Sequence, residues 1–237
     1  MIEIKNLTKT FGKFKALNNI NLSCKTGRAI ALIGPNGCRK TTLIKSILGL
    51  NTVESGQILV NGNDVSESYH YREIIGYMPQ IGKYPENMTI RETLDIILNN
   101  RSQTKKLDIE LIDAYDITKI ENKRMGNLSG GTIQKVSAII AFMFNPSIII
   151  LDEPTAGLDP IAAEILKHKI IKEQKKGKLI IITSHLLSDL EQIVDEVIFL
   201  SEGKVIFHKN VEDIKQSTQE DSLSKAITTI LRQVQDV

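Results

Sequence analysis

One segment of the chain, residues 34–42, combines small turn-forming residues with a lysine and two hydroxyls, in the order GPNGCRKTT. Its spacing follows the phosphate-loop pattern G-x-x-x-x-G-K-[ST], apart from a departure at Arg39. In such a loop the backbone N–H groups surround the β-phosphate of a nucleotide, and the following helix adds its positive N-terminal end. We expect Lys40 to neutralise the β- and γ-phosphates and the Thr41 hydroxyl to ligate Mg²⁺. The expected nucleotide-binding residues are Gly34, Pro35, Asn36, Gly37, Cys38, Arg39, Lys40, Thr41 and Thr42.

Two acids, Asp152 and Glu153, directly follow the apolar run 147–151. The run is apolar on both faces, which predicts a buried parallel strand. Ligands of open parallel sheets bind at the carboxyl ends of the strands. We therefore expect Asp152 to hold Mg²⁺ through water and Glu153 to polarise an attacking water. Alone, the two acids would be read as caps of the next helix, but the phosphate loop upstream favours the catalytic interpretation.

A third segment, Leu128 to Gln134 (LSGGTIQ), places a serine and two glycines at the start of a predicted helix. Bare N–H groups and a hydroxyl at a helix start can bind an anion. Together with the loop and the acids, this segment resembles the signature LSGGQ of the ATP-binding-cassette (ABC) family, with Thr132 in the fifth position. The resemblance implies that one subunit closes on the γ-phosphate held by another through Ser129, Gly130 and Gly131.

Further residues match the family's motifs in order over about residues 2–207. The resemblance implies that Phe11 stacks on adenine, as any aromatic ring can on a base. It implies that Gln80 contacts Mg²⁺ and the membrane subunit, and that Asp159 crosses a dimer interface. His185 resembles the histidine that contacts the γ-phosphate. A lone histidine at a strand end is more often structural, but its order in the chain favours the catalytic role. The implied cofactors are ATP and Mg²⁺.

Arg39 stands where the family has a glycine. The glycine lets the backbone approach the phosphates without a Cβ in the way. Three alternatives exist for the arginine side chain. It crowds the loop or the sheet behind it, it points outward and leaves the loop intact, or its charge helps to bind phosphate. The first is favoured, because phosphate loops work through main-chain geometry. We therefore expect ATP affinity or turnover to be reduced.

Hydrophobic patterning predicts the elements that position these residues. Ile2, Ile4 and Leu7 open a strand, and residues 29–33 form an apolar strand that ends at the phosphate loop. Residues 41–48 have helical spacing. Strand, glycine-rich turn and helix together are typical of a phosphate-binding unit.

The remaining pattern alternates strands with helices, which predicts a mainly parallel sheet covered on both faces. Residues 179–183 are a second buried strand, and residues 194–200 and 204–207 predict a hairpin. The resemblance implies an α/β fold with a P-loop NTPase core of the RecA type and an antiparallel β part. The charge run 172–178 is interpreted as a solvated helix end.

The expected domain organisation is a nucleotide-binding domain over 1–215, with a helical subdomain of about 85–145 inserted in the core. The tail, 216–237, is expected to form an amphipathic helix with Leu223, Ile227 and Ile230 on one face. That face either packs on its own domain or docks a partner subunit.

Composition limits the classes of partner and the compartment that the chain can be expected to have. The chain has 237 residues and a net charge of +2, too mild to favour nucleic acid. Its two cysteines match neither a disulfide framework nor a zinc pattern, which is typical of a reducing compartment. Apolar runs are far shorter than the ~20 residues that span a bilayer. Another chain would therefore supply membrane spans, and the expected location is cytoplasmic, on the inner face of the membrane.

The resulting hypothesis is an ATP-hydrolysing subunit of an ABC transporter, working as a homodimer or heterodimer with integral membrane subunits of the ABC-2 type. The short cassette and residues 156–162 (AGLDPIA) resemble the subunits that pair with ABC-2-type membrane proteins. In particular, they resemble the ATPase of the nitrous-oxide-reductase maturation system, which handles copper or sulfur species. Two alternatives stay open: a regulatory subunit that binds nucleotide without catalysis, and a soluble ABC ATPase of DNA repair or ribosomes.

Overall fold

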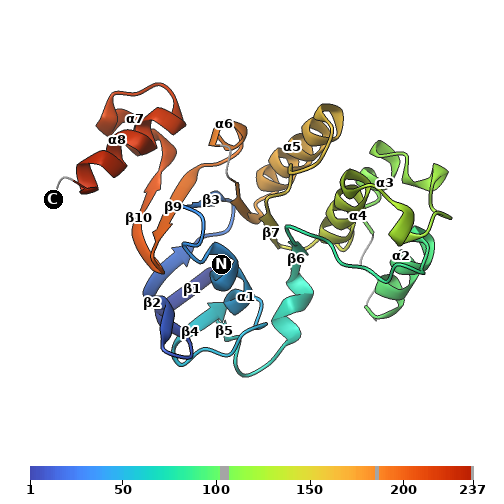
Figure 1. The fold of residues 1–237 in the computed structure, drawn as a ribbon, viewed down its shortest axis with the longest axis horizontal. Coiled ribbons are helices and arrows are strands. Elements are labelled where there is room, and N and C mark those ends of the chain that lie inside the picture. The colour runs from blue at the N-terminus through green and yellow to red at the C-terminus, as the bar shows by residue number, and fades with distance from the viewer. Residues whose placement is uncertain (102–106, 185–186, 236–237) are drawn as a thin grey trace.

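Most strands of the chain join one mixed sheet (Figure 1). The computed structural model describes residues 1–101, 107–184 and 187–235. The strand order of this sheet is β10-β9-β3-β8-β7-β6. Its members are β3 (Ala29–Ile33), β6 (Ile75–Met78), β7 (Ile148–Asp152), β8 (Leu179–Thr183), β9 (Glu196–Ser201) and β10 (Lys204–Asn210). All neighbours pair in parallel except β9 and β10, which form an antiparallel hairpin. The expected mainly parallel sheet is confirmed.

A second, antiparallel sheet has the order β2-β1-β4-β5. Its strands are β1 (Ile2–Phe11), β2 (Phe14–Cys24), β4 (Ser55–Val60) and β5 (Asn63–Asp64). Ile2, Ile4 and Leu7 of β1 are all buried, as their spacing predicts for a strand with one face on a core. Gly12 and Lys13 connect β1 to β2, so that Phe11 and Phe14 face each other across the hairpin.

Helices cover both faces of the larger sheet, as Figure 1 shows. Alternate residues of β3 belong to different cores: Ala31 packs in one, and Ile30 in the other. Leu43 of the helix after the phosphate loop shares the core of Ile30, and Leu166 shares that of Ala31. The helices are α1 (Lys40–Ile47), α2 (Ile90–Asn99), α3 (Glu110–Ala114), α4 (Gly130–Phe142), α5 (Pro160–Lys175), α6 (Leu187–Leu190), α7 (Val211–Thr218) and α8 (Leu223–Gln235), with short 3-10 turns at His70–Ile74, Ile117–Lys119 and Met125–Asn127.

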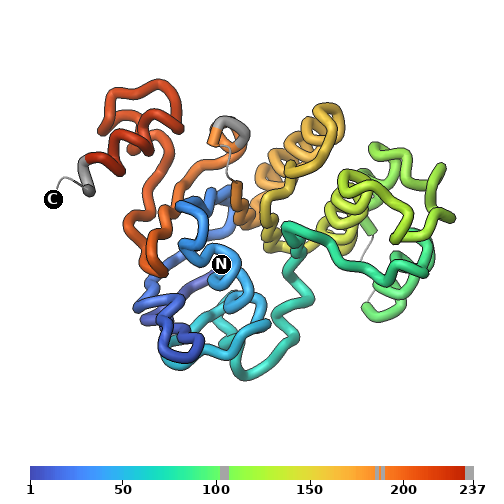
Figure 2. Tube along the Cα trace, viewed as in Figure 1, coloured from blue at the N-terminus to red at the C-terminus, as the bar shows by residue number. Residues whose placement is uncertain are grey.

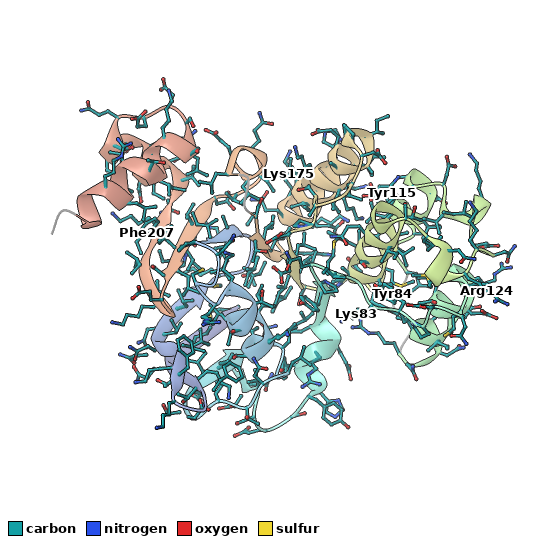
Figure 3. The ribbon with its side chains drawn as sticks, in the orientation of Figure 1. Lys83, Tyr84, Tyr115, Arg124, Lys175 and Phe207 are labelled. Carbon is teal, nitrogen blue, oxygen red and sulfur yellow. The ribbon has the colours of Figure 1, made fainter. Side chains whose placement is uncertain are left out.

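Helices α2, α3 and α4 gather at one side of the fold, on the right in Figure 1. They lie between β6 and β7 in the chain, and the subdomain limits of about 85–145 stay a prediction. Two tyrosines outside α4 and α5, labelled in Figure 3, form hydrogen bonds to residues of these two helices. The Tyr84 hydroxyl lies 2.9 Å from Ser137 Oγ, and the Tyr115 hydroxyl donates to the Ala162 carbonyl over 3.1 Å.

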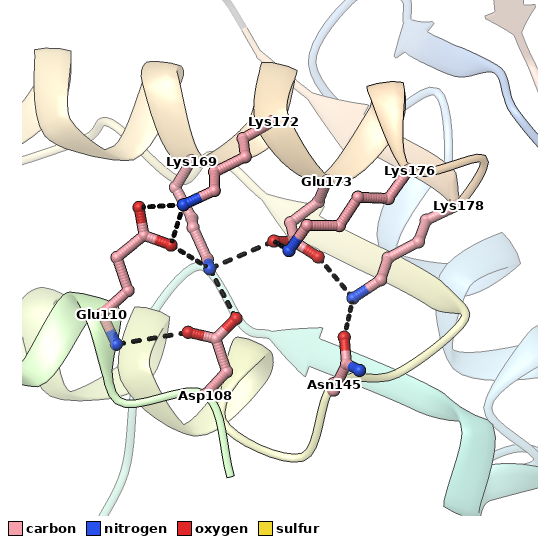
Figure 4. A network of polar contacts seen from close by, with 8 residues as sticks. All are labelled: Asp108, Glu110, Asn145, Lys169, Lys172, Glu173, Lys176 and Lys178. Atoms are coloured by element: carbon pink, nitrogen blue, oxygen red, sulfur yellow. Dashed lines mark hydrogen bonds and ion pairs between the residues drawn. The ribbon is translucent and has the colours of Figure 1, made fainter. Parts of the chain in front are cut away.

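An ion network centred on the buried Lys169 also joins the start of α3 to α5 (Figure 4). The Lys169 ammonium lies 2.5 Å from Asp108, 2.7 Å from Glu110 and 3.1 Å from Glu173. Glu173 is fully buried and also binds Lys176 and Lys178. The interpretation of 172–178 as a solvated helix end is therefore wrong for two of its members, because Glu173 and Lys178 are buried.

The C-terminal segment packs on its own chain, where its path can be followed in Figure 2. Leu223, Ile227 and Ile230 of α8 are buried against α6 and α7, as the first of the two alternatives predicts. Helix α7 runs across residue 215, so the expected boundary between domain and tail falls inside a helix. Among the described residues, no helix has the length and apolar character needed to cross a membrane.

Candidate active site

The phosphate loop leaves the end of β3 and enters α1 at Lys40. Gly34 has φ 150°, and a Cβ there would lie 2.0 Å from the Leu200 carbonyl oxygen, so only glycine fits. Lys40 is 8% exposed, and its ammonium donates to the Gly34 carbonyl over 2.8 Å and lies 3.7 Å from Cys38 Sγ. The loop thus curls around its own lysine, the arrangement that a phosphate-binding cradle needs.

One cavity of about 420 Å³ unites most of the residues expected to act together. It joins the phosphate loop to the ends of β6 and β7, which neighbour each other in the sheet. Its lining consists of Asn36, Gly37, Cys38, Arg39, Lys40, Thr41, Thr42, Gln80, Asp152 and Glu153. Loop, glutamine and acids, far apart in the sequence, therefore meet at the carboxyl edge of the parallel strands.

Asp152 is 3% exposed and accepts hydrogen bonds from two hydroxyls. Thr183 Oγ1 donates to it over 2.5 Å, and Thr41 Oγ1 donates over 3.4 Å. A buried carboxylate needs such partners. Mg²⁺ prefers oxygen ligands, and Thr41, Asp152 and the amide oxygen of Gln80 provide a donor set that fits this ion.

Glu153 is held by its neighbours on two sides. Its N–H donates to Thr183 Oγ1 over 2.9 Å, and its carboxylate accepts a 2.9 Å hydrogen bond from Gln80 Nε2. Its φ of 53° lies in the left-handed region, which costs a non-glycine residue on the order of 1 kcal/mol. Glu153 lines the cavity in this conformation.

Arg39 stands at the start of α1 with φ 85° and ψ 25°, also in the left-handed region. Its guanidinium carbon lies 4.4 Å from the centroid of the Phe14 ring in the β1–β2 hairpin. The expectation that the side chain crowds the loop or the sheet is therefore corrected. The side chain leaves toward the hairpin, because the Phe14 ring, 52% exposed, offers it a cation–π partner. A reduced turnover stays a prediction.

Phe11 lies at the end of β1, 53% exposed, with the Lys9 ammonium 4.7 Å from its ring centroid. It is not among the residues that line the cavity. Its hairpin partner Phe14 nevertheless connects it to the phosphate loop through Arg39. Stacking of Phe11 on adenine stays a prediction.

Ser129 caps α4 and accepts a hydrogen bond from the Thr132 N–H over 3.3 Å, while Thr132 Oγ1 lies 2.9 Å from its hydroxyl. A Cβ at Gly131 would lie 2.6 Å from the Gly157 carbonyl oxygen, so the two segments approach closely. Ser129, Gly130 and Gly131 do not line the cavity. Their expected action on a second subunit stays a prediction.

Asp159 is the N-cap of α5 and accepts from the Ala162 N–H over 2.8 Å. The Lys135 ammonium also binds it over 2.8 Å. This ion pair, and then the Ala162 hydrogen bond, hold the pKa of Asp159 below its usual value.

Nearer the cavity, burial and then the charge of Asp152 raise the pKa of Tyr77 to about 12, so its phenol stays protonated.

His185, expected to contact the γ-phosphate, lies outside the described residues. Three residues that the sequence did not single out help to build the site: Phe14, Thr183 and Lys135. Thr183 carried a signal, since it ends an apolar strand with a hydroxyl. It pairs with Asp152 in the β7–β8 register, which the two strands alone do not reveal.

Comparison with known proteins agrees with this site. A family model described as ABC transporter matches residues 17–156. The ABC transporter ATP-binding protein YhaQ of Bacillus subtilis is 34% identical, over 92% of this chain and 74% of its own. The lantibiotic transport ATP-binding protein SrtF of Streptococcus pyogenes is 32% identical, over 90% of this chain and 92% of its own. A solved ATP-binding subunit of an ABC transporter superposes with a TM-score of 0.89 at 26% identity, over 98% of this chain and 99% of that one. The P-loop NTPase fold is thereby confirmed.

Proposed function

The chain belongs to the ABC transporter family, and on that premise we propose that it is the ATP-hydrolysing subunit that powers an export transporter. The observation that carries the proposal is the cavity that joins the phosphate loop to Gln80, Asp152 and Glu153. A protein that only binds nucleotide needs the loop. A hydrolase also needs groups that stabilise charge and orient water beside it.

ATP would bind with its phosphates on the loop N–H groups and on Lys40. Thr41, Gln80 and Asp152 would hold Mg²⁺, which supplies neutralisation of the charge on the phosphate oxygens. Glu153 would orient the attacking water, with Gln80 and the Thr183 hydroxyl fixing its position. His185 would contact the γ-phosphate, as the family resemblance implies.

A second ATPase subunit completes this proposal. Ser129, Gly130 and Gly131 do not line their own chain's cavity, but their serine hydroxyl and N–H groups can bind a phosphate held by another copy. Asp159 would lie at the interface between two copies. The pair can be a homodimer or a heterodimer.

The membrane partner would contact the exposed surface around Gln80 and the helices between β6 and β7. We propose integral subunits of the ABC-2 type and a position on the cytoplasmic face of the membrane. The similarity to SrtF favours a lantibiotic-like peptide as cargo. The proposal of a copper or sulfur cargo, as in nitrous-oxide-reductase maturation, rests on the resemblance of the short cassette and residues 156–162. Lantibiotic resistance or production in cells with and without this chain separates the two.

The direct test is ATP hydrolysis by the purified chain, alone and with its co-purified membrane subunits. Glu153→Gln should bind ATP but lose hydrolysis by at least tenfold, because the amide is a poor acceptor for a proton of water. Nucleotide binding without hydrolysis in the complete transporter would support the regulatory alternative. Co-purification with ribosomes or DNA-repair proteins in place of membrane subunits would support the soluble one.

Arg39 sets the level of activity within this proposal. The phosphate loop has a left-handed backbone at this position, which arginine adopts less readily than glycine. We infer that ATP affinity or turnover is lower than with glycine. The expected reduction is modest, because the Phe14 contact offsets part of the strain.

A further inference from the structure

The Arg39 side chain crosses from the phosphate loop to the β1–β2 hairpin. Its guanidinium carbon lies 4.4 Å from the Phe14 ring centroid, within the ~6 Å over which a cation is attracted to an aromatic face. Phe14 is half exposed at the start of β2. Arg39 is half-buried and also lines the cavity, so one contact joins the cavity wall to the hairpin.

We propose that Phe14 is a positioning residue of the nucleotide site. Its ring holds the Arg39 guanidinium and so stabilises the left-handed backbone that the phosphate loop needs. The inference rests on the proposed nucleotide-binding function and deepens it. Phe14 does not itself line the cavity, and the inference places it behind the phosphate loop as the support of Arg39.

The backbone at Arg39 needs such support. With φ 85° and ψ 25°, Arg39 turns the chain into α1, and its carbonyl accepts the Leu43 N–H over 3.0 Å. Glycine visits this conformation freely, whereas an L side chain rarely adopts it. A side-chain contact that favours this conformation therefore shifts the loop toward its binding form.

The neighbouring cations are directed to different partners. The Lys40 ammonium donates to the Gly34 carbonyl inside the loop, while the Arg39 guanidinium lies on Phe14. This separation keeps two like charges apart where both side chains begin at adjacent positions. It also leaves the inside of the loop to Lys40.

The other aromatic of the hairpin plays no such part. The Lys9 ammonium lies over Phe11, but Lys9 belongs to the same strand and is paired with Glu54 over 3.0 Å. That contact stays within the antiparallel sheet. Phe11 is thus a matched control for Phe14: both rings are half exposed and both carry a cation, but the cation on Phe14 comes from the loop.

The test is a double-mutant cycle on the full chain, with Mg²⁺–ATP and Mg²⁺–ADP binding measured by calorimetry. Phe14→Ala should weaken both by roughly two- to fivefold, the size of an exposed cation–π contact. In the Arg39→Gly background the same change should have no effect. Phe14→Trp should retain native affinity, and Phe14→Leu should behave as Phe14→Ala, since it keeps apolar bulk without a π face. Phe11→Ala should weaken binding equally in both backgrounds.

Equal losses from Phe14→Ala in both backgrounds would overturn the inference, as would native affinity for Phe14→Leu. Tighter binding in Phe14→Ala would overturn it differently, by showing that the freed guanidinium binds phosphate itself. Thermal unfolding of the nucleotide-free variants gives a second readout. Phe14→Ala should lower the Tm in the chain that retains Arg39 and leave it unchanged in the Arg39→Gly background. If neither the native chain nor Arg39→Gly binds ATP while that coupling is present, the proposed function fails and the contact between the two residues stands.

Discussion

The Lys135 ammonium on α4 lies 2.8 Å from the Asp159 carboxylate that caps α5. The contact connects the helix that begins at Ser129 with the segment that follows Glu153. Gly131 and Gly157 approach closely in the same place. The candidate signature segment and the candidate dimer-interface aspartate are therefore connected within one chain by an ion pair and by a close backbone approach.

Lys135→Met should lower the thermal stability in a pH-dependent way. Because the Lys135 ion pair depresses the pKa of Asp159 below its ordinary 3.8, its stabilisation is present above that pH and is lost as the pH falls through the lowered pKa. The Tm difference between native chain and variant should thus be constant near neutral pH and shrink below about pH 4. Salt should reduce it as well.

Lys119→Met is the matched control, because Lys119 pairs with Asp116 on the open surface. It should change the Tm little at any pH. A Lys135→Met effect that persists unchanged at pH 2 would contradict an ion-pair origin and indicate lost packing of the lysine stem.

Thr183→Val should impair both stability and hydrolysis. The Thr183 hydroxyl donates to Asp152 and accepts from the Glu153 N–H, so its loss leaves a buried carboxylate short of a partner. The free energy of unfolding should fall by about 1–3 kcal/mol. ATP turnover should fall with it, since both acids lose a common support. Thr183→Ser keeps the hydroxyl and should retain most of the stability and of the turnover. A Thr183→Val variant with native stability and native turnover would contradict the assigned role.

Lys169→Met should be among the more destabilising single changes in the chain. Its side chain is 1% exposed, and its removal would leave Asp108, Glu110 and the buried Glu173 close together. Burial alone would raise the pKa of Glu173, but the hydrogen bonds from Lys176, Lys178 and Lys169 outweigh it and lower the pKa to about 2. Breaking a buried ion pair typically costs about 3–5 kcal/mol.

Denaturant unfolding measures this cost, and Lys172→Met is the control. Lys172 also binds Glu110, over 2.9 Å, but its side chain is 55% exposed, so less than about 1 kcal/mol should be lost. Equal losses in the two variants would contradict the importance of burial. The stabilisation from the network should be complete above about pH 4.5, the ordinary pKa of a glutamate, and should be lost progressively as the pH falls toward about 2, the lowered pKa of Glu173.

Sequence patterning predicts the strands and the order of the site segments because their signals are local. The run 147–151 is apolar on both faces, and it delivers Asp152 to the sheet edge as expected. The partners of these residues depend on contacts between distant segments. Thr183 meets Asp152 through the strand register, and Phe14 meets Arg39 where the β1–β2 hairpin lies beside the phosphate loop. Lys169 looks like any helix-surface lysine until α3 packs beside it.

Arg39→Gly should raise nucleotide affinity or turnover, by less than about tenfold. Two opposing effects set the size. Glycine removes the strain of φ 85°, on the order of 1 kcal/mol, but it also removes the Phe14 contact, worth about 0.5–1 kcal/mol at an exposed site. The gain should therefore be smaller than a distorted loop would predict, and larger in a Phe14→Ala background, where no contact is left to lose. Steady-state ATPase rates and ATP affinities of the native chain, the two single variants and the double variant check this. A gain of a hundredfold would indicate that the arginine blocks the site, and a loss of affinity would indicate that it binds phosphate.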